Sequence, residues 1–486
     1  MENNNNASRN EEWRVELRKS VSPKDRSSIE RVEMPQLSPA YRITCNEEVN
    51  QGISEQQAVR EATRCLDCAN PQCVTGCPVG INIPKFIKNI ERRHFADAAA
   101  TLKETSSLPA VCGRVCPQEK QCESKCIRLK MKQPAVAIGY LERFAADWQR
   151  TNCADEATHT APNLGIKVAV VGSGPSGLSF AGEMAKQGFD VTVFEALHEI
   201  GGVLKYGIPE FRLPNAVVDH EIEGLRKMGV DFQKDVLVGR TITYDDLHTM
   251  GFKGIFVGSG AGFPRFMNIP GENLNGVMSS NEYLTRINLM QAGRGGDTPV
   301  LTGDTVAVVG GGNTAMDSSR TALRMGAKRV ILVYRRSEAE MPARLEEIGH
   351  AKEEGVELMT LHNPVEYVGD EKGRVCAMKV QRMELGEPDA SGRRSPIPVE
   401  GAIEEVPVNV VIVAVGVSPN SLVPRSIDGL EVSRRGTIVV NDESMQSNIS
   451  DLYAGGDIVR GGATVILAMG DGRKAAQNMA KQLLHE

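Results

Sequence analysis

The residues with the clearest chemical potential are cysteines, because eight of the eleven in the chain fall between Cys65 and Cys126. They form two runs, Cys65-x2-Cys68-x4-Cys73-x3-Cys77-Pro78 and Cys112-x3-Cys116-Pro117-x4-Cys122-x3-Cys126. Proteins that hold two iron-sulfur clusters use a run C-x2-C-x2-C-x3-C-P, whose fourth thiolate binds the other cluster. Zinc is the main alternative, since C-x2-C pairs suit tetrahedral sites. The interleaved Cys-Pro pairs favour iron-sulfur ligation.

A glycine-rich turn, Gly172-x-Gly174-x-x-Gly177, follows the apolar segment KVAVV. In dinucleotide-binding folds such a turn lets backbone N–H groups approach a pyrophosphate at a helix N-terminus. The segment VTVFE then ends in an acidic residue placed to bind a ribose hydroxyl, which makes a purely structural glycine turn the weaker interpretation. The residues predicted to contact this first dinucleotide are Gly172, Gly174, Pro175, Ser176, Gly177, Glu195 and Gly202.

The far end of the chain indicates that the first dinucleotide is FAD rather than NAD. The segment LYAGGD places Gly456 and Asp457 just after a short strand, where a carboxylate can hold the ribityl or phosphate part of a flavin. Gly461, Gly462 and Ala463 then open the last helix, whose positive N-terminal end is expected to face the flavin. Ala463 and Thr464 are predicted to contact the cofactor. An ordinary helix entry is the alternative for these small residues.

A second turn, Gly310-x-Gly312-x-x-Ala315, follows the apolar segment DTVAVV, and Asn313 and Thr314 lie inside it. Alanine is accepted at its third position, because only a small residue is needed for helix-strand contact. The next predicted strand, VILVYRR, ends in Arg335 and Arg336, where an NAD-specific site carries an acidic residue. A guanidinium there can bind a 2′-phosphate, so NADPH is predicted rather than NADH. Two solvated surface arginines are the alternative interpretation.

These motifs require elements that position them, and the pattern of strand, glycine turn, helix and strand occurs twice. We therefore predict an α/β protein with an N-terminal α-helical iron-sulfur domain followed by two Rossmann-like domains, the NADPH domain being inserted in the FAD domain. Helical patterns such as SEQQAVREATRCL, with Ser54 as a cap, surround the cysteines. The predicted divisions are a polar arm (1–50), the helical domain (51–150), the FAD domain (165–300 and 425–486) and the NADPH domain (301–424).

Composition excludes several classes of function for this chain of 486 residues. A net charge of -6 offers no basic field for a nucleic acid. The polar N-terminus has no apolar core of a signal peptide, and the longest apolar runs, such as Val410 to Val415, are strand-sized. The expectation is a cytoplasmic protein without a membrane or nucleic-acid partner, in which clustered thiols bind metal rather than form disulfides. The sequence gives no indication of its oligomeric state.

The runs RCLDCANPQCVTGCPVGINIP, PAVCGRVCPQEKQCESKC, VVGSGPSGL, GGVLKYGIPEFRLP, VVGGGNTAMD and YRRSEAEMPAR follow one another in this order. In this the chain resembles the glutamate synthase small (beta) subunit family from about residue 30 onward. It is also similar to two relatives of that family. These are the large subunit of the electron-bifurcating NADH-dependent reduced ferredoxin:NADP oxidoreductase and the N-terminal half of dihydropyrimidine dehydrogenase.

The resemblance implies two [4Fe-4S] clusters in the helical domain. It assigns Cys65, Cys68, Cys73 and Cys126 to one cluster, and Cys77, Cys116, Cys122 and Glu142 to the other. Cys112 has no role in the family pattern, yet by spacing alone it competes with Glu142 for the fourth position. The choice matters because a carboxylate is a harder ligand than a thiolate and alters the cluster potential. Cys45, Cys153 and Cys376 are expected to be ordinary thiols.

The implied reaction passes a hydride from nicotinamide to flavin and then single electrons to the clusters, so no catalytic proton carrier is expected. His220 and His350 are expected to be solvated. The expected partner is a glutamate synthase large subunit or, alternatively, a ferredoxin-reductase-like flavoprotein small subunit. A different class of function, a redox-binding scaffold that does not oxidise NADPH, is disfavoured because all parts for nicotinamide oxidation are present.

Overall fold

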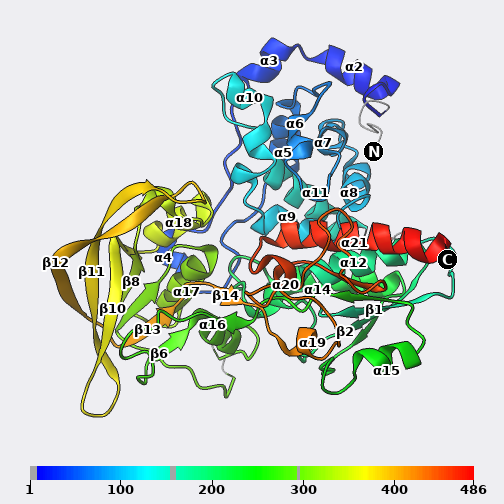
Figure 1. Cartoon of the computed structure of the whole chain (residues 1–486). Helices are drawn as coiled ribbons and strands as arrows, with labels where there is room; N and C mark the ends of the chain where they lie inside the picture. The colour runs from blue at the N-terminus through cyan, green and yellow to red at the C-terminus, as the bar shows by residue number, and fades with distance from the viewer. Residues whose placement is uncertain (1–7, 154–159, 293–295, 486) are drawn as a thin grey trace.

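Two five-stranded parallel sheets form most of the chain (Figure 1). The computed structural model describes residues 8–153, 160–292 and 296–485. The first sheet has the order β15-β4-β1-β2-β3, and each pairing in it is parallel. Its strands are β1 (Lys167–Val171), β2 (Asp190–Phe194), β3 (Asp231–Gln233), β4 (Gly254–Val257) and β15 (Leu452–Ala454). Because β15 comes from near the C-terminus, the chain returns to its first sheet, as expected if the second domain is inserted in the first.

Helices cover both faces of this first sheet, which explains the unbroken apolar character of its central strand. Val168, Ala169 and Val170 of β1 are fully buried, as expected for a parallel strand between two helical layers. The helix after the first glycine turn packs along the C-terminal helix. The helices are α12 (Pro175–Lys186), α13 (Val203–Tyr206), α14 (Asn215–Lys227), α15 (Tyr244–Thr249), α19 (Leu422–Arg425), α20 (Asp457–Arg460) and α21 (Val465–His485).

The second parallel sheet has the order β6-β13-β7-β8-β9 and carries the second glycine turn. Its strands are β6 (Val277–Ser279), β7 (Thr305–Val309), β8 (Arg329–Tyr334), β9 (Glu357–Thr360) and β13 (Val410–Val413). Its helices are α16 (Ser280–Asn288), α17 (Asn313–Arg324), the 3-10 helix η3 (Glu338–Glu340) and α18 (Leu345–Glu353). The predicted boundary at residue 300 differs from this arrangement, because β6 already pairs with β13. Strand β6 is too short for its partner sheet to be predicted from the sequence.

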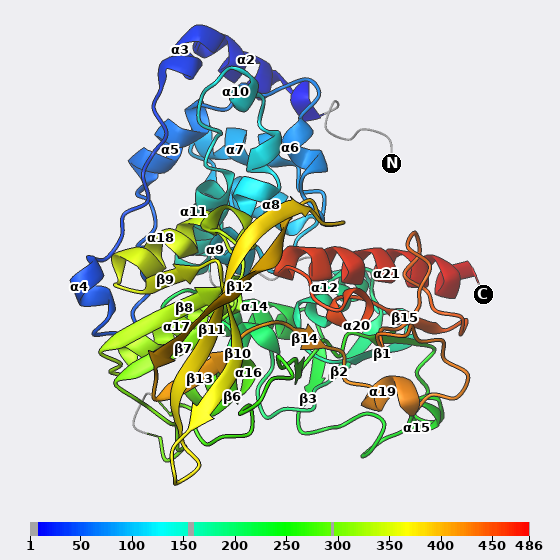
Figure 2. The same cartoon turned by 60° about the vertical axis from the view of Figure 1, so that its left-hand side comes forward.

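An antiparallel sheet in the second domain was not expected from the sequence. Strands β10 (His362–Gly369), β11 (Val375–Pro388) and β12 (Arg394–Pro407) form it, and Figure 2 shows them extending beyond the parallel sheet. Its buried Met378 and Val380 pack with Ala307 and Ile331 of the second parallel sheet. The short antiparallel pair β5 (Phe263–Pro264) and β14 (Val417–Ser418) joins the segments that pass between the two parallel sheets.

The cysteine-rich part is helical, as predicted. Ser54 caps its first helix in a capping box with Gln57, and Ala58 and Ala62 are fully buried. Its elements are α5 (Glu55–Thr63), α6 (Gln72–Thr75), α7 (Ile83–Glu91), α8 (Phe95–Lys103), α9 (Pro109–Val115), η1 (Gln118–Lys120), η2 (Glu123–Lys125), α10 (Ile127–Lys130) and α11 (Ile138–Asn152). No helix in the described ranges is both long enough and apolar enough to cross a bilayer.

The polar arm before this domain is held to it by buried ion pairs. It contains the short helices α2 (Glu12–Ser20), α3 (Pro23–Ser28) and α4 (Pro39–Arg42). Arg14 pairs with Asp67, and Arg26 pairs with Glu91 at 2.7 Å, with all four side chains almost completely buried. The polar sequence also predicts weak order at the very start of the arm, in residues that lie outside the described ranges.

The helical domain lies against both nucleotide-binding domains (Figures 1 and 2). Toward the first domain, the backbone N–H of Ala110 donates to buried Glu221 of α14 at 2.7 Å. Toward the second, the ammonium of Lys120 donates to the carbonyls of Pro342 and Ala343, each at 2.9 Å. The cysteine domain is therefore fixed at the junction of the two sheets, beside the edge where both glycine turns lie.

Candidate functional site

A large cleft lies between the two nucleotide-binding domains. Its volume is about 1640 Å³, which exceeds the roughly 300–1,000 Å³ of an ordinary small-molecule pocket. The predicted residues that line it are Gly172, Gly174, Pro175, Ser176, Glu195, Gly202, Gly312, Asn313, Thr314, Gly456, Asp457, Ala463 and Thr464. The other predicted residues, Gly177, Gly310, Ala315, Arg335 and Arg336, do not line it. One cavity therefore brings together both glycine turns and the C-terminal segment, with room for two dinucleotides.

The first glycine turn has the geometry that close approach to a phosphate requires. Gly172 has a φ of +99°, and a Cβ there would lie 2.6 Å from the carbonyl oxygen of Gly258. A Cβ on Gly177 would lie 2.0 Å from the carbonyl oxygen of Gly172, so this glycine allows α12 to pack on β1. Gly174 precedes α12 without a side-chain cap, and nothing lies within 4 Å of its Cβ position. The helix N-terminus thus faces open space in the cleft, as a phosphate site needs.

Glu195 stands at the end of β2, where the sequence places the ribose-binding acid. Its carboxylate accepts hydrogen bonds from the backbone N–H of Ser173 and of Leu197, each at 2.9 Å, and from the Ser173 hydroxyl at 2.5 Å. Glu195 therefore also fixes the glycine turn. Gly202 approaches the same turn from the other side, because its Cβ position is 2.9 Å from the Cα of Gly174.

The C-terminal segment forms another wall of the cleft. The backbone N–H of Gly456 donates to buried Asp471 at 3.0 Å, and the same carboxylate pairs with Arg460 at 2.5 Å. These contacts hold the turn that presents Asp457, whose pKa is raised by burial. Asp471 was not predicted as a site residue, since it supports the turn from α21 rather than lining the cavity.

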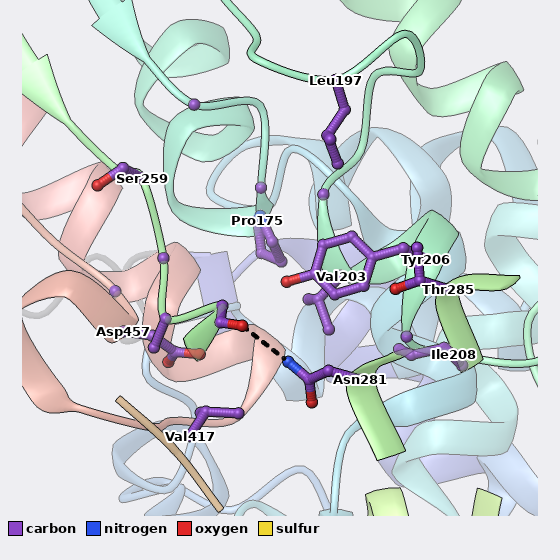
Figure 3. Close-up of a pocket in the computed structure, with 18 of the residues that line it drawn as sticks. Pro175, Leu197, Val203, Tyr206, Ile208, Ser259, Asn281, Thr285, Val417 and Asp457 are labelled. Carbon is purple, nitrogen blue, oxygen red and sulfur yellow. Dashed lines mark hydrogen bonds between the residues drawn. The ribbon is translucent and has the colours of Figure 1, made fainter. Parts of the chain in front are cut away.

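Tyr206 and Asn281 are cleft residues that the sequence analysis missed. Figure 3 shows both facing the same space as Asp457, with the amide nitrogen of Asn281 donating to the carbonyl of Gly262 at 3.4 Å. Burial, together with the charges of Asp457 and Glu195, raises the pKa of Tyr206 to about 12. Its phenol therefore remains a hydrogen-bond donor at neutral pH. Tyr206 lies in the run GGVLKYGIPEFRLP, which indicates the family but does not by itself indicate which of its residues face the cleft.

The second glycine turn repeats the arrangement in the other domain. Gly310 has a φ of +143°, and a Cβ there would lie 2.4 Å from the carbonyl oxygen of Ala414. Ala315 is fully buried against the sheet, which explains why a small side chain suffices. The side-chain oxygen of Asn313 accepts from the backbone N–H of Arg344 at 2.9 Å. Gly312 begins α17 without a side-chain cap, so this helix N-terminus also opens into the cleft.

The two arginines at the end of β8 differ in their surroundings. Arg336 is 5% exposed, pairs with Asp389 at 2.5 Å and donates to the carbonyl of Arg394 at 2.7 Å. Arg335 is exposed, and among the described residues it has neither a hydrogen-bond nor an ion-pair partner. Arg335 is therefore the arginine that remains available to a ligand.

The first cysteine group gathers residues from distant positions in the chain. Cys73 lies close enough to Cys65, Cys126 and Cys68 for their charges to add to the rise in its pKa that burial causes. Burial also raises the pKa of Cys65 to about 12. Thiols in such a site remain protonated unless a cation compensates for thiolate formation, which iron does. The donor set therefore fits a cluster.

The second cysteine group contains the candidate carboxylate. The charge of Glu142 acts on Cys77, Cys116 and Cys122, and also on Cys112, so these side chains lie near one another. Glu142 is 6% exposed, one of its carboxylate oxygens has no hydrogen-bond partner, and burial raises its pKa to about 8. A buried carboxylate oxygen without a hydrogen-bond partner, among thiols, is an arrangement that a bound cation would satisfy. Cys112 lies beside the same group, hydrogen-bonded to Cys116, with its sulfur 3.4 Å from that of Met469.

The spacing within these groups also bears on the zinc alternative. In the ranges that the structure describes, no three His, Cys, Asp or Glu side chains converge on the position of a single ion. A zinc ion needs such convergence, because its Zn–S distance is only about 2.3 Å. A four-iron cluster instead separates its ligands at four corners. The described residues therefore offer no group of the kind that a single zinc ion requires.

The expectation of a solvated His350 is wrong. Its side chain is 3% exposed on α18, and neither ring nitrogen has a hydrogen-bond partner. Its pKa is lowered because of burial. The interpretation failed because α18 packs against the arm and the helical domain, which the sequence pattern of one helix does not reveal. His220 is half-buried on α14, with a pKa lowered chiefly by burial, and does not line the cleft.

Comparison with known proteins agrees with this architecture. Residues 42–154 match the family described as dihydropyrimidine dehydrogenase domain II, 4Fe-4S cluster, and residues 166–472 match the pyridine nucleotide-disulphide oxidoreductase family. The solved structure of Mycobacterium tuberculosis FprA in complex with NADPH has a TM-score of 0.55 and 21% identity, covering 66% of this chain and 85% of that chain. This likeness confirms the predicted fold of the nucleotide-binding domains.

Two curated relatives extend over nearly all of the chain. The glutamate synthase [NADPH] small chain of Escherichia coli (strain K12) is 36% identical over 468 residues, covering 94% of this chain and 98% of that protein. The NADP(+)-dependent formate dehydrogenase subunit beta of Moorella thermoacetica is 38% identical over 435 residues, covering 85% of this chain and 60% of that protein. The chain therefore belongs to the glutamate synthase small chain family of NAD(P)-dependent flavin and iron-sulfur oxidoreductases.

Proposed function

We propose that the chain is the NADPH-oxidising small subunit of a cytoplasmic glutamate synthase. In this role it passes electrons through FAD and two [4Fe-4S] clusters to a larger partner subunit. The observation that carries the proposal is the single cleft that both glycine turns line, with the helical cysteine domain fixed at its edge. The near-complete length match to a glutamate synthase small chain supports the choice of partner.

FAD is assigned to the first domain. The α12 N-terminus would receive its pyrophosphate, Glu195 its adenosine ribose, and the Gly456–Asp457 turn with the start of α21 the flavin end. Bound flavin supplies the conversion between a hydride pair and single electrons. The protein contributes position and exclusion of water, since Tyr206 and Asn281 close the cleft beside the flavin end.

NADPH is assigned to the second domain. The α17 N-terminus at Gly312, Asn313 and Thr314 would receive the pyrophosphate. Arg335 would pair with the 2′-phosphate, because a guanidinium binds phosphate with two parallel hydrogen bonds. Arg336, which was also predicted to contact NADPH, serves instead to hold the segment 389–394.

The cluster ligands proposed are those that the family resemblance implies. Cys65, Cys68, Cys73 and Cys126 would hold one cluster, while Cys77, Cys116, Cys122 and Glu142 would hold the other. The orphaned oxygen of Glu142 supports it over Cys112, whose sulfur contacts Met469. The second set is the one nearer the cleft, since Pro78 lies against Gly470 of α21 and Pro117 lines the cavity.

Anaerobic reduction of the reconstituted chain, alone and with its partner, tests this function. We expect NADPH to bleach the flavin absorbance much faster than NADH, and the chain with a glutamate synthase large subunit from the same genome to form glutamate at the expense of NADPH. Electron exchange with a ferredoxin-reductase-like flavoprotein instead of the large subunit would select the bifurcating alternative. A flavin that NADPH leaves oxidised would overturn the proposal and favour a scaffold role.

A further inference from the structure

An exposed segment directly after Cys126 combines lysines with large apolar side chains. We call it the α10 patch and define it as Lys125, Ile127, Leu129, Lys130, Met131 and Lys132. Ile127, Leu129 and Met131 are 38%, 46% and 45% exposed. Residues 124–134 contain no acidic side chain, although the whole chain carries a net charge of -6. The patch is thus a basic and apolar island on an acidic protein.

The local structure explains why these apolar side chains stay outside. Arg128 occupies the inward position of α10 and is 2% exposed. Its guanidinium donates to the carbonyls of Arg26 at 3.0 Å and Ser27 at 3.1 Å, which ties α10 to the arm. The backbone N–H of Gln133 closes the turn on the carbonyl of Arg128. Because a charged side chain fills the interior, the neighbouring apolar residues have no core position to enter.

The patch lies at the end of the helical domain away from the cleft. Figure 1 shows α10 beside α3, on the side opposite α20 and α21. The cysteine group around Glu142 adjoins the cleft, whereas the group that includes Cys126 lies beyond it. In the inner group Cys116 and Cys122 are buried and Cys77 is partly exposed, whereas all four cysteines of the outer group are partly exposed. The shortest covalent path from a proposed cluster ligand to exposed apolar surface therefore leads from Cys126 into the patch.

We infer that the α10 patch is the docking surface for the protein that accepts electrons from this chain, and that this partner presents an acidic rim around an apolar centre. The inference rests on the proposed function. Complementary charge steers association, while a small apolar core supplies contact area at short range. Each encounter would move one electron from the cluster that Cys126 would help to hold to the oxidised redox group of the partner, and NADPH would replace the electrons in pairs. The neighbouring arm carries charges of both signs, with Lys24 and Arg31 beside Asp25 and Glu30. Its charges therefore do not cancel the positive charge of the patch lysines.

Reversing the charge of the patch lysines tests whether they attract an acidic partner. Two one-electron acceptors are compared, the acidic soluble domain of cytochrome b5 and the basic cytochrome c. The first test variant carries Lys125→Glu, Lys130→Glu and Lys132→Glu. A second test variant carries only the changes at Lys130 and Lys132, so that no substitution lies directly beside the proposed cluster ligand Cys126. The control variant carries Lys234→Glu, Lys253→Glu and Lys372→Glu, with the same change in net charge at exposed positions elsewhere. We expect KM for cytochrome b5 to rise about tenfold in both test variants and reduction of cytochrome c to become faster. The control should resemble the wild-type chain.

A binding measurement keeps the inference separate from the proposed function. Fluorescence anisotropy of labelled, oxidised cytochrome b5 is followed during titration with each holoprotein, without NADPH. Leu129→Ser with Met131→Ser should weaken binding about tenfold, whereas Ile397→Ser with Ile403→Ser, exposed on β12, should leave it unchanged. Unchanged binding in all patch variants, or equal loss in the controls, would overturn the docking surface. Failure of NADPH to bleach the wild-type flavin would instead count against the proposed function.

Discussion

At the scale of single residues, Arg335 and Arg336 at the end of β8 differ in what they contact. Both follow β8, but one is free toward solvent and the other is used inside its own domain. Charge alone therefore does not identify the phosphate ligand, because a guanidinium already engaged by a carboxylate cannot also bind a phosphate with full strength.

Replacing Arg335 with alanine should reduce kcat/KM for NADPH by about 10- to 100-fold, the equivalent of one charge-assisted contact of roughly 1.5–3 kcal/mol. The value for NADH should change little, since NADH lacks the 2′-phosphate. The matched Arg336→Ala variant should retain the preference for NADPH and lose thermal stability, because Asp389 loses its partner. Steady-state reduction of an artificial acceptor with each nucleotide measures both effects. A preference lost in Arg336→Ala but kept in Arg335→Ala would reverse the assignment.

Glu142 and Cys112 offer a second contrast at this scale. Wild-type chain should contain about eight iron and eight sulfide per chain, and Glu142→Ala should lose about half of each, because one cluster loses its fourth ligand. Cys112→Ser should keep the full amount, since its sulfur faces Met469. Glu142→Cys should restore iron while shifting the potential of one cluster in a redox titration followed by electron paramagnetic resonance. Full iron in Glu142→Ala would remove this carboxylate from the ligand set.

At the scale of elements, the segment between α13 and α14 joins the two nucleotide-binding domains. It is the GIPEFRLP part of the family run. Arg212 crosses from the first domain to pair with Asp317 of α17 at 2.6 Å and with Glu347 of α18 at 3.3 Å, all in a buried position. Phe211 beside it lies under the guanidinium of Arg324, 3.9 Å from ring centre to carbon. These contacts fix the second glycine turn relative to the first.

Replacing Arg212 with methionine should lower stability by about 3–5 kcal/mol, because it leaves buried Asp317 without its cation and leaves Glu347 with Arg320 alone. The flavin should still bind, but its reduction by NADPH should slow, since the two domains would no longer share one fixed orientation. Differential scanning calorimetry and stopped-flow absorbance measure these quantities. The double variant Arg212→Met with Asp317→Leu should recover part of the stability. Flavin reduction at the wild-type rate in the single variant would show that the ion pairs do not position the nicotinamide.

At the scale of the whole molecule, the cleft, the cysteine group with Glu142 and the group with Cys126 follow one another toward the α10 patch. The helical domain contacts both nucleotide-binding domains. The order of these sites therefore depends on how the three domains pack together, not on the fold of any single domain. If the proposed function holds, a chain arranged in this way would separate the hydride step at the cleft from single-electron delivery at the far end.

This order predicts that loss of either cluster blocks delivery without blocking hydride transfer. Cys77→Ser, in the group next to the cleft, and Cys68→Ser, in the outer group, should both leave flavin bleaching by NADPH near the wild-type rate. Both should lower NADPH-driven reduction of the partner by at least about tenfold, as expected when a one-electron relay loses a step. Parallel measurements of flavin and partner absorbance compare the two steps. A Cys68→Ser chain that reduces the partner normally would show that electrons leave from the inner group.

The sequence by itself determined the features that local spacing controls. The two glycine turns, the acid at the end of β2, the Ser54 cap and the division into helical and α/β parts follow from residues close together in the chain, and the structure agrees with them. The family was also identifiable from the order of its motifs. These properties depend on backbone geometry over a few residues, which side-chain type largely dictates.

Only the tertiary structure decided which distant residues meet. In the structure β6 belongs to the second sheet, an antiparallel sheet is present, and His350 is buried. Arg336 pairs with Asp389, whereas Arg335 is exposed to solvent. It also revealed the ion pairs of Arg212 and the orphaned oxygen of Glu142. Such outcomes depend on how whole domains pack, because burial and pairing are set by neighbours that lie far away in the sequence.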